Sequence, residues 1–250
     1  YWDIKAYFLE GLLTCKKVYN LNLENVSEIN KAKINYSLGL MYNNVGNIPD
    51  AEKFIKDALI IFRKIDDKLG ISECLNSLGV IISISPSRMK EAKEYYEEAL
   101  TIVKELNLKR NTANLLYNMS YMAIAENDTD LALEYRLESL AIYRELKDFS
   151  QLSRTLASLS VFEQRRYNFD KAIFYNEESL AIATELDDKY LISINLVNLG
   201  NIYFGKEDFD NACKMFNESL SILREYEYKS NLIAILPLIG KTLEKKGEYE

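Results

Sequence analysis

The chain contains no histidine, and its 250 residues include only three prolines, nine glycines and three cysteines. Without histidine, no Ser-His-Asp or Cys-His catalytic site and no His-ligated metal site can be built from this chain alone. β-Sandwiches, barrels and βαβ folds need Gly- and Pro-rich turns throughout. The scarcity of both residues therefore indicates a nearly all-helical protein.

Basic charge and long apolar runs are also scarce. Thirty-one Lys and Arg residues against 38 Asp and Glu residues give a net charge of −7, and no basic run could follow a phosphate backbone, so we expect no nucleic-acid partner. Apolar stretches such as Val80-Ile81-Ile82 are far shorter than the roughly 20 residues of a membrane span, so we expect no membrane insertion.

The three cysteines, Cys15, Cys74 and Cys213, are far apart and lie in apolar-periodic segments without a C-x-x-C arrangement. We interpret them as small buried hydrophobic residues in a reducing compartment, which predicts a cytoplasmic protein. The sequence also has no Gly-rich phosphate loop, no Gly-x-Ser-x-Gly and no clustered metal-ligand spacing. We therefore expect no cofactor, no metal and no catalytic activity.

A sequence repeat with a nearly constant period runs through the whole chain. Its clearest motif is a small residue followed by Leu, and these leucines are Leu59, Leu100, Leu140, Leu180 and Leu220. Their positions differ by 41, 40, 40 and 40. Two series of small residues keep the same phase, namely Gly39, Gly79, Ser120, Ser160, Gly200 and Gly240, and then Ala51, Ala92, Ala132, Ala172 and Ala212.

Small residues at these offsets let two antiparallel helices approach closely, while Leu and Ile fill the seam between neighbouring pairs. The sequence therefore predicts a repeated helical hairpin. Asn47, Asp128, Asn168 and Asp208 fall at the phase where a side-chain oxygen caps the second helix. The second repeat instead has a one-residue insertion at 83–87, where we expect a distorted turn.

These features resemble the tetratricopeptide repeat (TPR) family. The resemblance rests on the small residues, on Leu-Gly-x-x-Tyr at 38–42 and 199–203, and on aromatic residues at Phe54, Tyr95, Tyr135 and Tyr175. The 40-residue period is similar to the long repeats of kinesin light chain, of the adaptor Pins and of bacterial peptide-sensing regulators. It implies an all-α, right-handed superhelix, an α-solenoid of about 12 helices in antiparallel pairs.

We expect one solenoid over residues 1–250. Its complete repeats are predicted at 28–68, 69–108, 109–148, 149–188 and 189–228, with a truncated repeat at 1–27 and another at 229–250. Leu232, Ile233, Leu236, Ile239 and Leu243 on the last helix would lack their usual cover. Solenoids normally finish with polar capping helices, so we expect an internal piece of a longer protein and weak end-to-end self-association.

The resemblance implies a concave groove lined by the first helices of the repeats. Its predicted binding residues are Tyr36, Asn43, Asn76, Asn114, Tyr117, Asn118, Tyr121, Arg154, Gln164, Arg165, Asn198 and Asn201. Asn amides can pair with the backbone of an extended peptide, and Tyr supplies flat contact area. Alternatively, Asn only tolerates a solvated helix face, and Arg154 and Arg165 pair with groove carboxylates such as Glu73.

The slot for the first Lys of the chaperone-binding carboxylate clamp holds Tyr36, Asn76, Tyr117, Ala157 and Val197, so we do not expect binding of an Hsp70 or Hsp90 tail. The recurring carboxylates of the second helices, such as Glu98, Glu138 and Glu178, are assigned to a solvated convex face. The leading hypothesis is a scaffold or sensor module that binds a peptide or protein segment. The alternative is a regulatory arm of an enzyme, such as a kinase, cyclase or protease, with its catalytic domain elsewhere.

Overall fold

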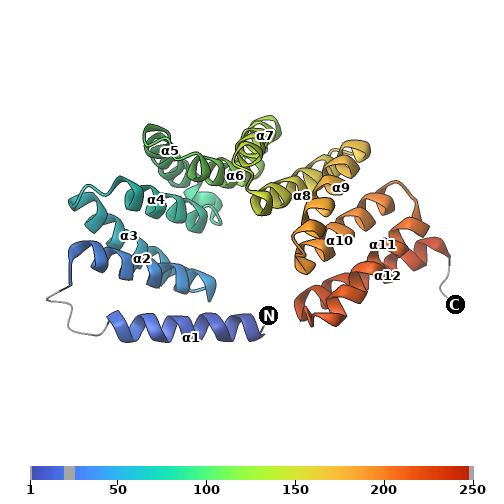
Figure 1. Cartoon of the computed structure of the whole chain (residues 1–250), viewed down its shortest axis with the longest axis horizontal. Helices are drawn as coiled ribbons and strands as arrows, with labels where there is room; N and C mark the ends of the chain where they lie inside the picture. The colour runs from blue at the N-terminus through green and yellow to red at the C-terminus, as the bar shows by residue number, and fades with distance from the viewer. Residues whose placement is uncertain (1, 20–25, 248–250) are drawn as a thin grey trace. The chain divides into compact units, whose positions relative to one another are not determined.

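The structure is a computed structural model that describes residues 2–19 and 26–247. Within these ranges it contains twelve α-helices, one short 3₁₀ helix and no strand (Figure 1). The predicted all-α architecture of about 12 helices is confirmed.

Most of the helices pack against one another in consecutive pairs along the chain. They are α1 (Trp2–Tyr19), α2 (Glu28–Asn44), α3 (Ile48–Lys64), α4 (Lys68–Ile82), α5 (Met89–Glu105), α6 (Lys109–Ala125), α7 (Thr129–Glu145), α8 (Phe149–Arg165), α9 (Phe169–Glu185), α10 (Lys189–Gly205), α11 (Phe209–Glu225) and α12 (Lys229–Lys246). Within repeats, α2 packs on α3, α4 on α5, α8 on α9 and α10 on α11. The second helix of a repeat also contacts the first helix of the following repeat. Helix α3 packs on α4, and α11 packs on α12.

The chain forms two compact units, Trp2–Glu138 and Ser139–Glu250, and the boundary between them falls inside α7. A continuous apolar cluster fills the first unit and contains Leu38, Ile55, Tyr96 and Leu115. In the second unit, α11 and α12 share a smaller cluster around Phe216. Between α8 and α11 that unit buries many polar side chains, including Ser153, Asn176 and Asn195.

A common turn explains the regular period of the repeat. Most helices have the same length, as α2, α3, α6 and α11 show, and a three-residue turn connects each to the next. The middle turn residue has a positive φ, at Gly46, Asp66, Asn107, Asn127, Lys147, Tyr167, Asp187, Glu207 and Glu227. Around Glu207, the Asp208 amide donates to the Tyr203 carbonyl (2.9 Å) and the Glu207 amide to the Phe204 carbonyl (3.0 Å). This is the Schellman arrangement, which pairs the last carbonyls of a helix.

Three of the four predicted helix caps are confirmed. Asn47, Asp128 and Asp208 each accept a hydrogen bond from the amide three residues later, at 3.3, 3.1 and 3.1 Å. The prediction for Asn168 is wrong, because its side chain makes no cap and instead donates to Glu163 Oε2 at 2.7 Å. Glu163 is a buried carboxylate of the preceding helix, and it takes up the amide that would otherwise cap α9.

The expected distortion of the second repeat is confirmed. Helix α4 ends early at Ile82, and the 3₁₀ helix Pro86–Arg88 precedes α5. The Arg88 guanidinium donates to both Glu52 oxygens (2.6 and 2.7 Å) and to Glu91 (2.8 and 2.9 Å). Arg88 therefore joins the irregular turn to α3 and α5 with bidentate, charge-assisted hydrogen bonds.

Arg88→Ala is expected to lower the free energy of unfolding by about 1 kcal/mol at neutral pH, because the pair is only partly exposed and belongs to a network. The hydrogen bond from Arg88 lowers the pKa of Glu52 from 4.5 to about 2. A carboxyl with a depressed folded-state pKa stabilises the fold above its ordinary pKa and stops doing so as pH falls through the folded value. Urea unfolding should therefore show a higher free energy of unfolding for the wild type than for Arg88→Ala at pH 7. This difference should decline between about pH 4.5 and 2, and a difference independent of pH would contradict the prediction.

The carboxylates assigned to the solvated face pair with cations of the preceding second helix. Arg63 contacts Glu98 (2.7 Å), Lys104 contacts Glu138 (3.9 Å) and Arg144 contacts Glu178. Glu98 and Glu138 are exposed and Glu178 is half-buried. This surface ladder follows the register of the repeats and leaves the first helices without these charges.

The prediction for the last helix is correct in part. Ile233 and Leu236 are 74% and 52% exposed. Leu232 and Ile239 instead pack on the cluster around Phe216. The prediction that these two side chains would be uncovered is therefore wrong. At 100° per residue, Ile233 points away from Leu232 and Ile239, whereas Leu236 lies next to them at the edge of the same face.

Candidate functional site

In the first unit, predicted binding residues of successive first helices hydrogen bond to one another. The Tyr36 hydroxyl of α2 lies 3.0 Å from the Ser77 hydroxyl of α4, and Asn118 Nδ2 of α6 donates to Asn76 Oδ1 of α4 at 2.9 Å. The partners are 41 and 42 residues apart. In both bonds a residue three positions before the Gly or Ser of one repeat meets the residue two positions before the Gly or Ser of the next repeat. We call the surface formed by Tyr36, Asn76, Ser77, Tyr117, Asn118 and Tyr121 the polar face.

The amide pair of the polar face has unused hydrogen-bonding capacity. A side-chain amide offers two donors and two acceptor positions, and the bond between Asn76 and Asn118 uses one of each. Both side chains are only half-buried, so the remaining groups are accessible. The bond between the two amides holds them in a defined orientation, which suits recognition of a peptide backbone.

The tyrosines of the polar face are held in place by their neighbours. Burial raises the pKa of Tyr36 to about 12, so its phenol keeps its proton at neutral pH. The hydroxyls of Tyr117 and Tyr121 lie 2.8 Å apart, with their rings edge to face at 5.3 Å. Tyr121 is 50% exposed, and the buried guanidinium of Arg136 lies 5.2 Å from its ring centre. Tyr121 thus presents an aromatic surface supported from below by a cation.

Arg136 is itself held in place by α6. It is 3% exposed, and its Nε donates to the Ser120 hydroxyl at 3.1 Å. A buried guanidinium is costly unless it is hydrogen bonded. The series of Gly and Ser residues had indicated only a close helix contact, and the structure adds that Ser120 supplies an acceptor for this buried cation.

The other predicted binding residues take less defined positions. Asn43 and Asn114 on α2 and α6 are half-buried, as are Gln164 on α8 and Asn201 on α10. Arg154 and Arg165 are both exposed on α8. Glu73 faces Lys33 and Asp67 in its own unit, and its half-buried position raises the pKa of its carboxyl.

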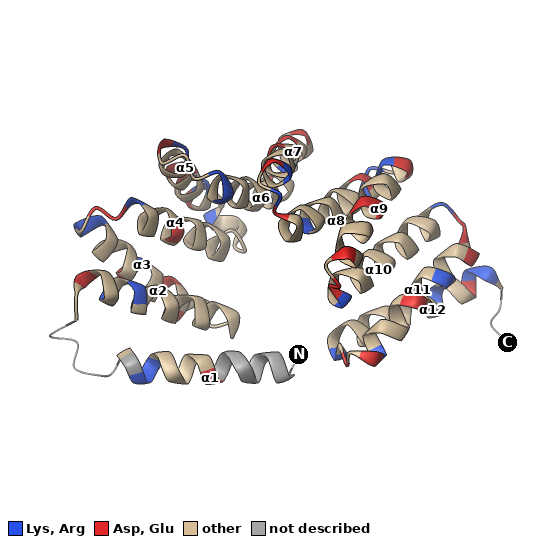
Figure 2. Ribbon diagram, in the orientation of Figure 1, with Lys and Arg blue, Asp and Glu red and all other residues tan. Residues whose placement is uncertain are grey.

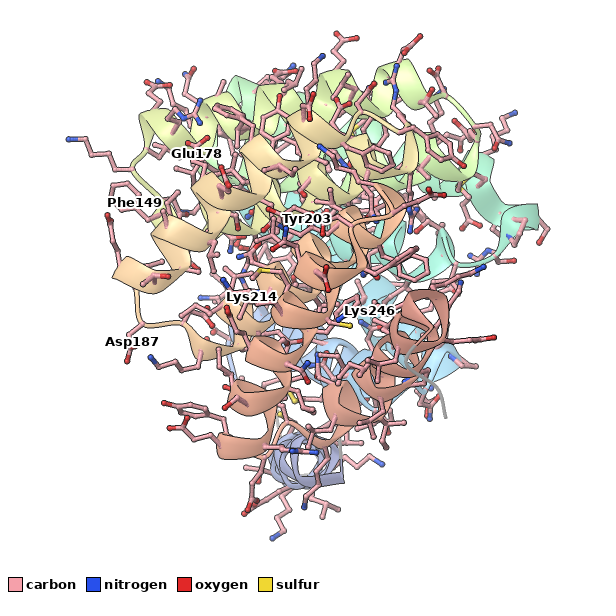
Figure 3. The ribbon with its side chains drawn as sticks, turned by 90° about the vertical axis from the view of Figure 1, so that its right-hand side faces the viewer. Phe149, Glu178, Asp187, Tyr203, Lys214 and Lys246 are labelled. Atoms are coloured by element: carbon pink, nitrogen blue, oxygen red, sulfur yellow. The ribbon has the colours of Figure 1, made fainter. Side chains whose placement is uncertain are left out.

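In the second unit, Asn198 lies at a pocket of about 100 Å³ formed by α10, α11 and α12. Figure 3 views these helices with α11 and α12 in front, and Tyr203, Lys214 and Lys246 mark the three in turn. Three polar residues, Ser193, Asn198 and Asn231, line the pocket together with six apolar ones. No charged side chain takes part in the lining. We call this site the α10–α12 pocket.

Charge is sparse along two of the first helices, α6 and α10. Helix α6 carries charge only at Lys109 and Arg110 and α10 only at Lys189, in each case at the start of the helix. Figure 2 shows both ribbons largely without charged residues beyond that end, whereas the second helices α5 and α9 carry charges of both signs. The surfaces of α6 and α10 therefore suit an uncharged segment with hydrogen-bonding groups.

Two further observations concern the described residues only. In residues 2–19 and 26–247, no group of three or more His, Cys, Asp or Glu side chains is placed to hold a metal ion. None of the helices described is both long enough and apolar enough to cross a membrane.

The sequence-based prediction did not include two residues of these sites. Asn231 lines the α10–α12 pocket together with Asn198, and Ala234 also lines that pocket. Ala234 had a signal in the sequence, because the equivalent position six residues before the Gly or Ser holds a larger side chain in the other repeats.

Comparison with known proteins supports the repeat assignment. Two family profiles described as tetratricopeptide repeat match residues 30–105 and 195–225. No curated protein sequence matches the chain significantly.

Several solved structures have the same fold. BtubC (BKLC) from P. vanneervenii has a TM-score of 0.71 and 20% identity, over 90% of this chain and 91% of that one. A Rap protein in complex with Competence and Sporulation Factor has a TM-score of 0.72 and 16% identity, over 97% and 72%. A signal-transduction STAND ATPase with a tetratricopeptide repeat sensor, from Pyrococcus horikoshii, has a TM-score of 0.76 and 16% identity, over 85% of this chain and 32% of that one.

Proposed function

The chain is built of tetratricopeptide repeats, and from this premise we propose that it is a non-catalytic scaffold or sensor module that binds an extended peptide or protein segment. The polar face is the candidate binding surface of the first unit, and the α10–α12 pocket is a separate candidate site of the second unit. The ligand is largely uncharged where it meets α6 and α10, because those two helices carry little charge.

The observation that carries this proposal is the hydrogen bond between Asn76 and Asn118. It orients two half-buried amides from adjacent repeats and leaves donors and acceptors of both accessible. An extended peptide offers alternating N–H and C=O groups that pair with such amides. The ring of Tyr121 beside them adds contact area at low entropic cost.

The structural neighbours support a peptide as the ligand. One is a Rap protein in complex with Competence and Sporulation Factor, and another is a Rap conjugation regulator of the plasmid pLS20 in complex with the Phr* peptide. These ligands belong to those proteins, and at 16% and 17% identity the likeness concerns the fold. It makes a peptide a sensible first probe.

The double substitution Asn76→Ala with Asn118→Ala is expected to weaken binding of a peptide selected on the wild-type chain about tenfold or more. The reason is that each lost amide removes a hydrogen bond worth about 1 kcal/mol. Titration calorimetry measures the change in Kd. Asn217→Ala on α11, outside the polar face, is the matched control and should leave Kd unchanged. Equal affinity of the double variant and the wild type would contradict the proposal.

A second candidate is a regulatory arm of a larger enzyme. The STAND ATPase favours it, because its repeat sensor is one part of a much longer chain, of which this protein matches 32%. In that case the ligand of the polar face would be a segment of the same polypeptide. The reading frame on both sides of the present sequence decides between the two candidates.

The remaining parts of the proposal rest on the sequence. We propose that the module needs neither metal nor cofactor and has neither nucleic-acid nor membrane partners, since the net charge is −7 and no basic run is present. We propose the cytoplasm as its compartment, on the argument from its three cysteines.

A further inference from the structure

The α10–α12 pocket is a small pocket of the second unit, lined by nine residues of three helices. We propose that it is a specificity subsite that accepts one uncharged, branched aliphatic side chain of the bound peptide. This inference rests on the proposed function, and it adds a chemical requirement at one position of the ligand.

The pocket exists because one side chain is short. Ala234 occupies the position six residues before the Gly or Ser of its repeat. The equivalent residues of the preceding repeats are Lys33, Glu73, Asn114, Arg154 and Ile194. Each of these is longer than Ala, so at Ala234 alone the side chain is too short to cover the seam between successive first helices.

The floor of the pocket is apolar and closed. Leu223 of α11 and Ile235 of α12 are each 1% exposed and form its base. Ser193 also lies there, but its hydroxyl already donates to the Tyr190 carbonyl at 2.7 Å. A charged group placed on this floor would lose its hydration without gaining an ionic partner, which costs several kcal/mol. The floor therefore selects an apolar group.

Polar groups lie nearer the mouth. The half-buried amides of Asn198 on α10 and Asn231 on α12 line the pocket from two successive first helices. Neither side-chain amide hydrogen bonds to another residue in the described ranges. Together they can hold the N–H and C=O groups on either side of the inserted residue. The pocket thus combines apolar side chains with amide donors and acceptors from two helices.

The size and the lining of the pocket together indicate the class of side chain. The pocket volume is only about 100 Å³, which favours a single side chain over a longer segment. Methyl groups of Ile194, Val197 and Leu238 complete the wall and match a branched aliphatic group.

The test uses N-acetyl-leucine methylamide, which carries one aliphatic side chain between two peptide groups. In methyl NMR spectra of the whole chain, we expect saturable shifts at Ile235 and Leu238. The corresponding alanine derivative should bind about tenfold more weakly or worse, because each buried methylene contributes about 0.8 kcal/mol. The lysine derivative should produce no shift at these methyls.

Ala234→Leu fills the pocket and should abolish the shifts. Ala181→Leu is the matched control, since Ala181 is also an exposed helical alanine but lies on α9, away from the pocket lining. It should bind like the wild type. If the wild type shows no shift, if leucine and lysine derivatives act alike, or if Ala234→Leu still binds, the subsite is disproved.

These outcomes are separate from those of the proposed function. A selected peptide whose affinity depends on Asn76 and Asn118 but is unchanged by Ala234→Leu would support the proposed function and overturn the subsite. If the leucine derivative binds but substitution of Asn76 and Asn118 does not change peptide affinity, the subsite is supported and the role of the polar face is disproved.

Discussion

Asn176→Phe is expected to destabilise the protein when made alone and to stabilise it when Ser160→Gly is made in the same chain. Asn176 is fully buried, and neither atom of its amide has a hydrogen-bond partner. The facing residue Ser160 is also fully buried and donates to the Ala172 carbonyl at 2.8 Å. At the equivalent position, the other repeats pair either a glycine with a large apolar side chain or a serine with a side chain that hydrogen bonds to it.

The other repeats show which pairs are compatible. A Cβ added to Gly39 would lie 2.4 Å from Ile55, one on Gly79 would lie 2.7 Å from the Tyr96 ring, and one on Gly200 would lie 2.5 Å from the Phe216 ring. Where Ser replaces Gly, the facing residue is polar, as in Ser120 with Arg136 and Ser160 with Asn176. A large apolar residue at this position therefore requires Gly on the first helix.

The single change should cost about 1 to 3 kcal/mol, because a phenyl ring would meet the Ser160 Cβ. The double change removes an unpaired amide, which is worth about 1 to 3 kcal/mol, and buries a ring, against about 0.5 to 1 kcal/mol for Gly in a helix. We expect a net gain of about 1 to 2 kcal/mol. Urea unfolding of both single variants and the double variant gives the coupling energy.

The converse exchange in the next repeat is the control. Gly200→Ser with Phe216→Asn should reproduce the polar pair and lower stability, because Phe216 is 1% exposed at the centre of its cluster. Additive effects of Ser160→Gly and Asn176→Phe would show that the two side chains do not limit each other, and would contradict the pairing rule.

Gly79→Ala is expected to destabilise the protein by about 1 to 3 kcal/mol, even though alanine favours helices by about 1 kcal/mol over glycine. The new Cβ would lie 2.7 to 2.9 Å from three carbons of the Tyr96 ring. Tyr96 is 1% exposed, and its burial raises the pKa of its phenol to about 12. A ring this deeply buried cannot move aside without disturbing the cluster of the first unit, so α4 and α5 must separate. The midpoint of urea unfolding measures the loss.

Gly11→Ala is the matched control for this prediction. Its Cβ would meet only the Met41 sulfur at 3.2 Å, at the flexible part of a side chain. At this position the higher helix propensity of alanine should outweigh the contact with Met41. The free energy of unfolding should therefore stay equal or rise by up to about 1 kcal/mol. A Gly79→Ala variant as stable as the wild type would show that the close approach of α4 and α5 tolerates a methyl group.

The turns illustrate where sequence reasoning ends. The phase of Asn47, Asp128 and Asp208 was enough to predict their caps, because capping depends on residues three positions apart. The left-handed residues of the turns had a signal only in part. Gly46 and Asn127 favour a positive φ, whereas Lys147 and Tyr167 adopt one without any such preference. Packing of the flanking helices imposes that conformation.

The sequence predicted the candidate site only in part as well. The repeat phase placed Asn76 and Asn118 on first helices, but nothing in the sequence indicated that they bond to each other across 42 residues. Asn168 carried the same signal as its equivalents and yet turns to Glu163, because a buried carboxylate from another helix competes for its amide.

The sequence by itself determined the all-helical class, the 40-residue period and the family, because these depend on composition and on regular spacing along one chain. Only the tertiary structure decided which polar side chains satisfy one another, which buried amides stay unpaired, and where Ala234 leaves a pocket. Each of these outcomes depends on side chains from neighbouring helices that meet only after the hairpins have packed.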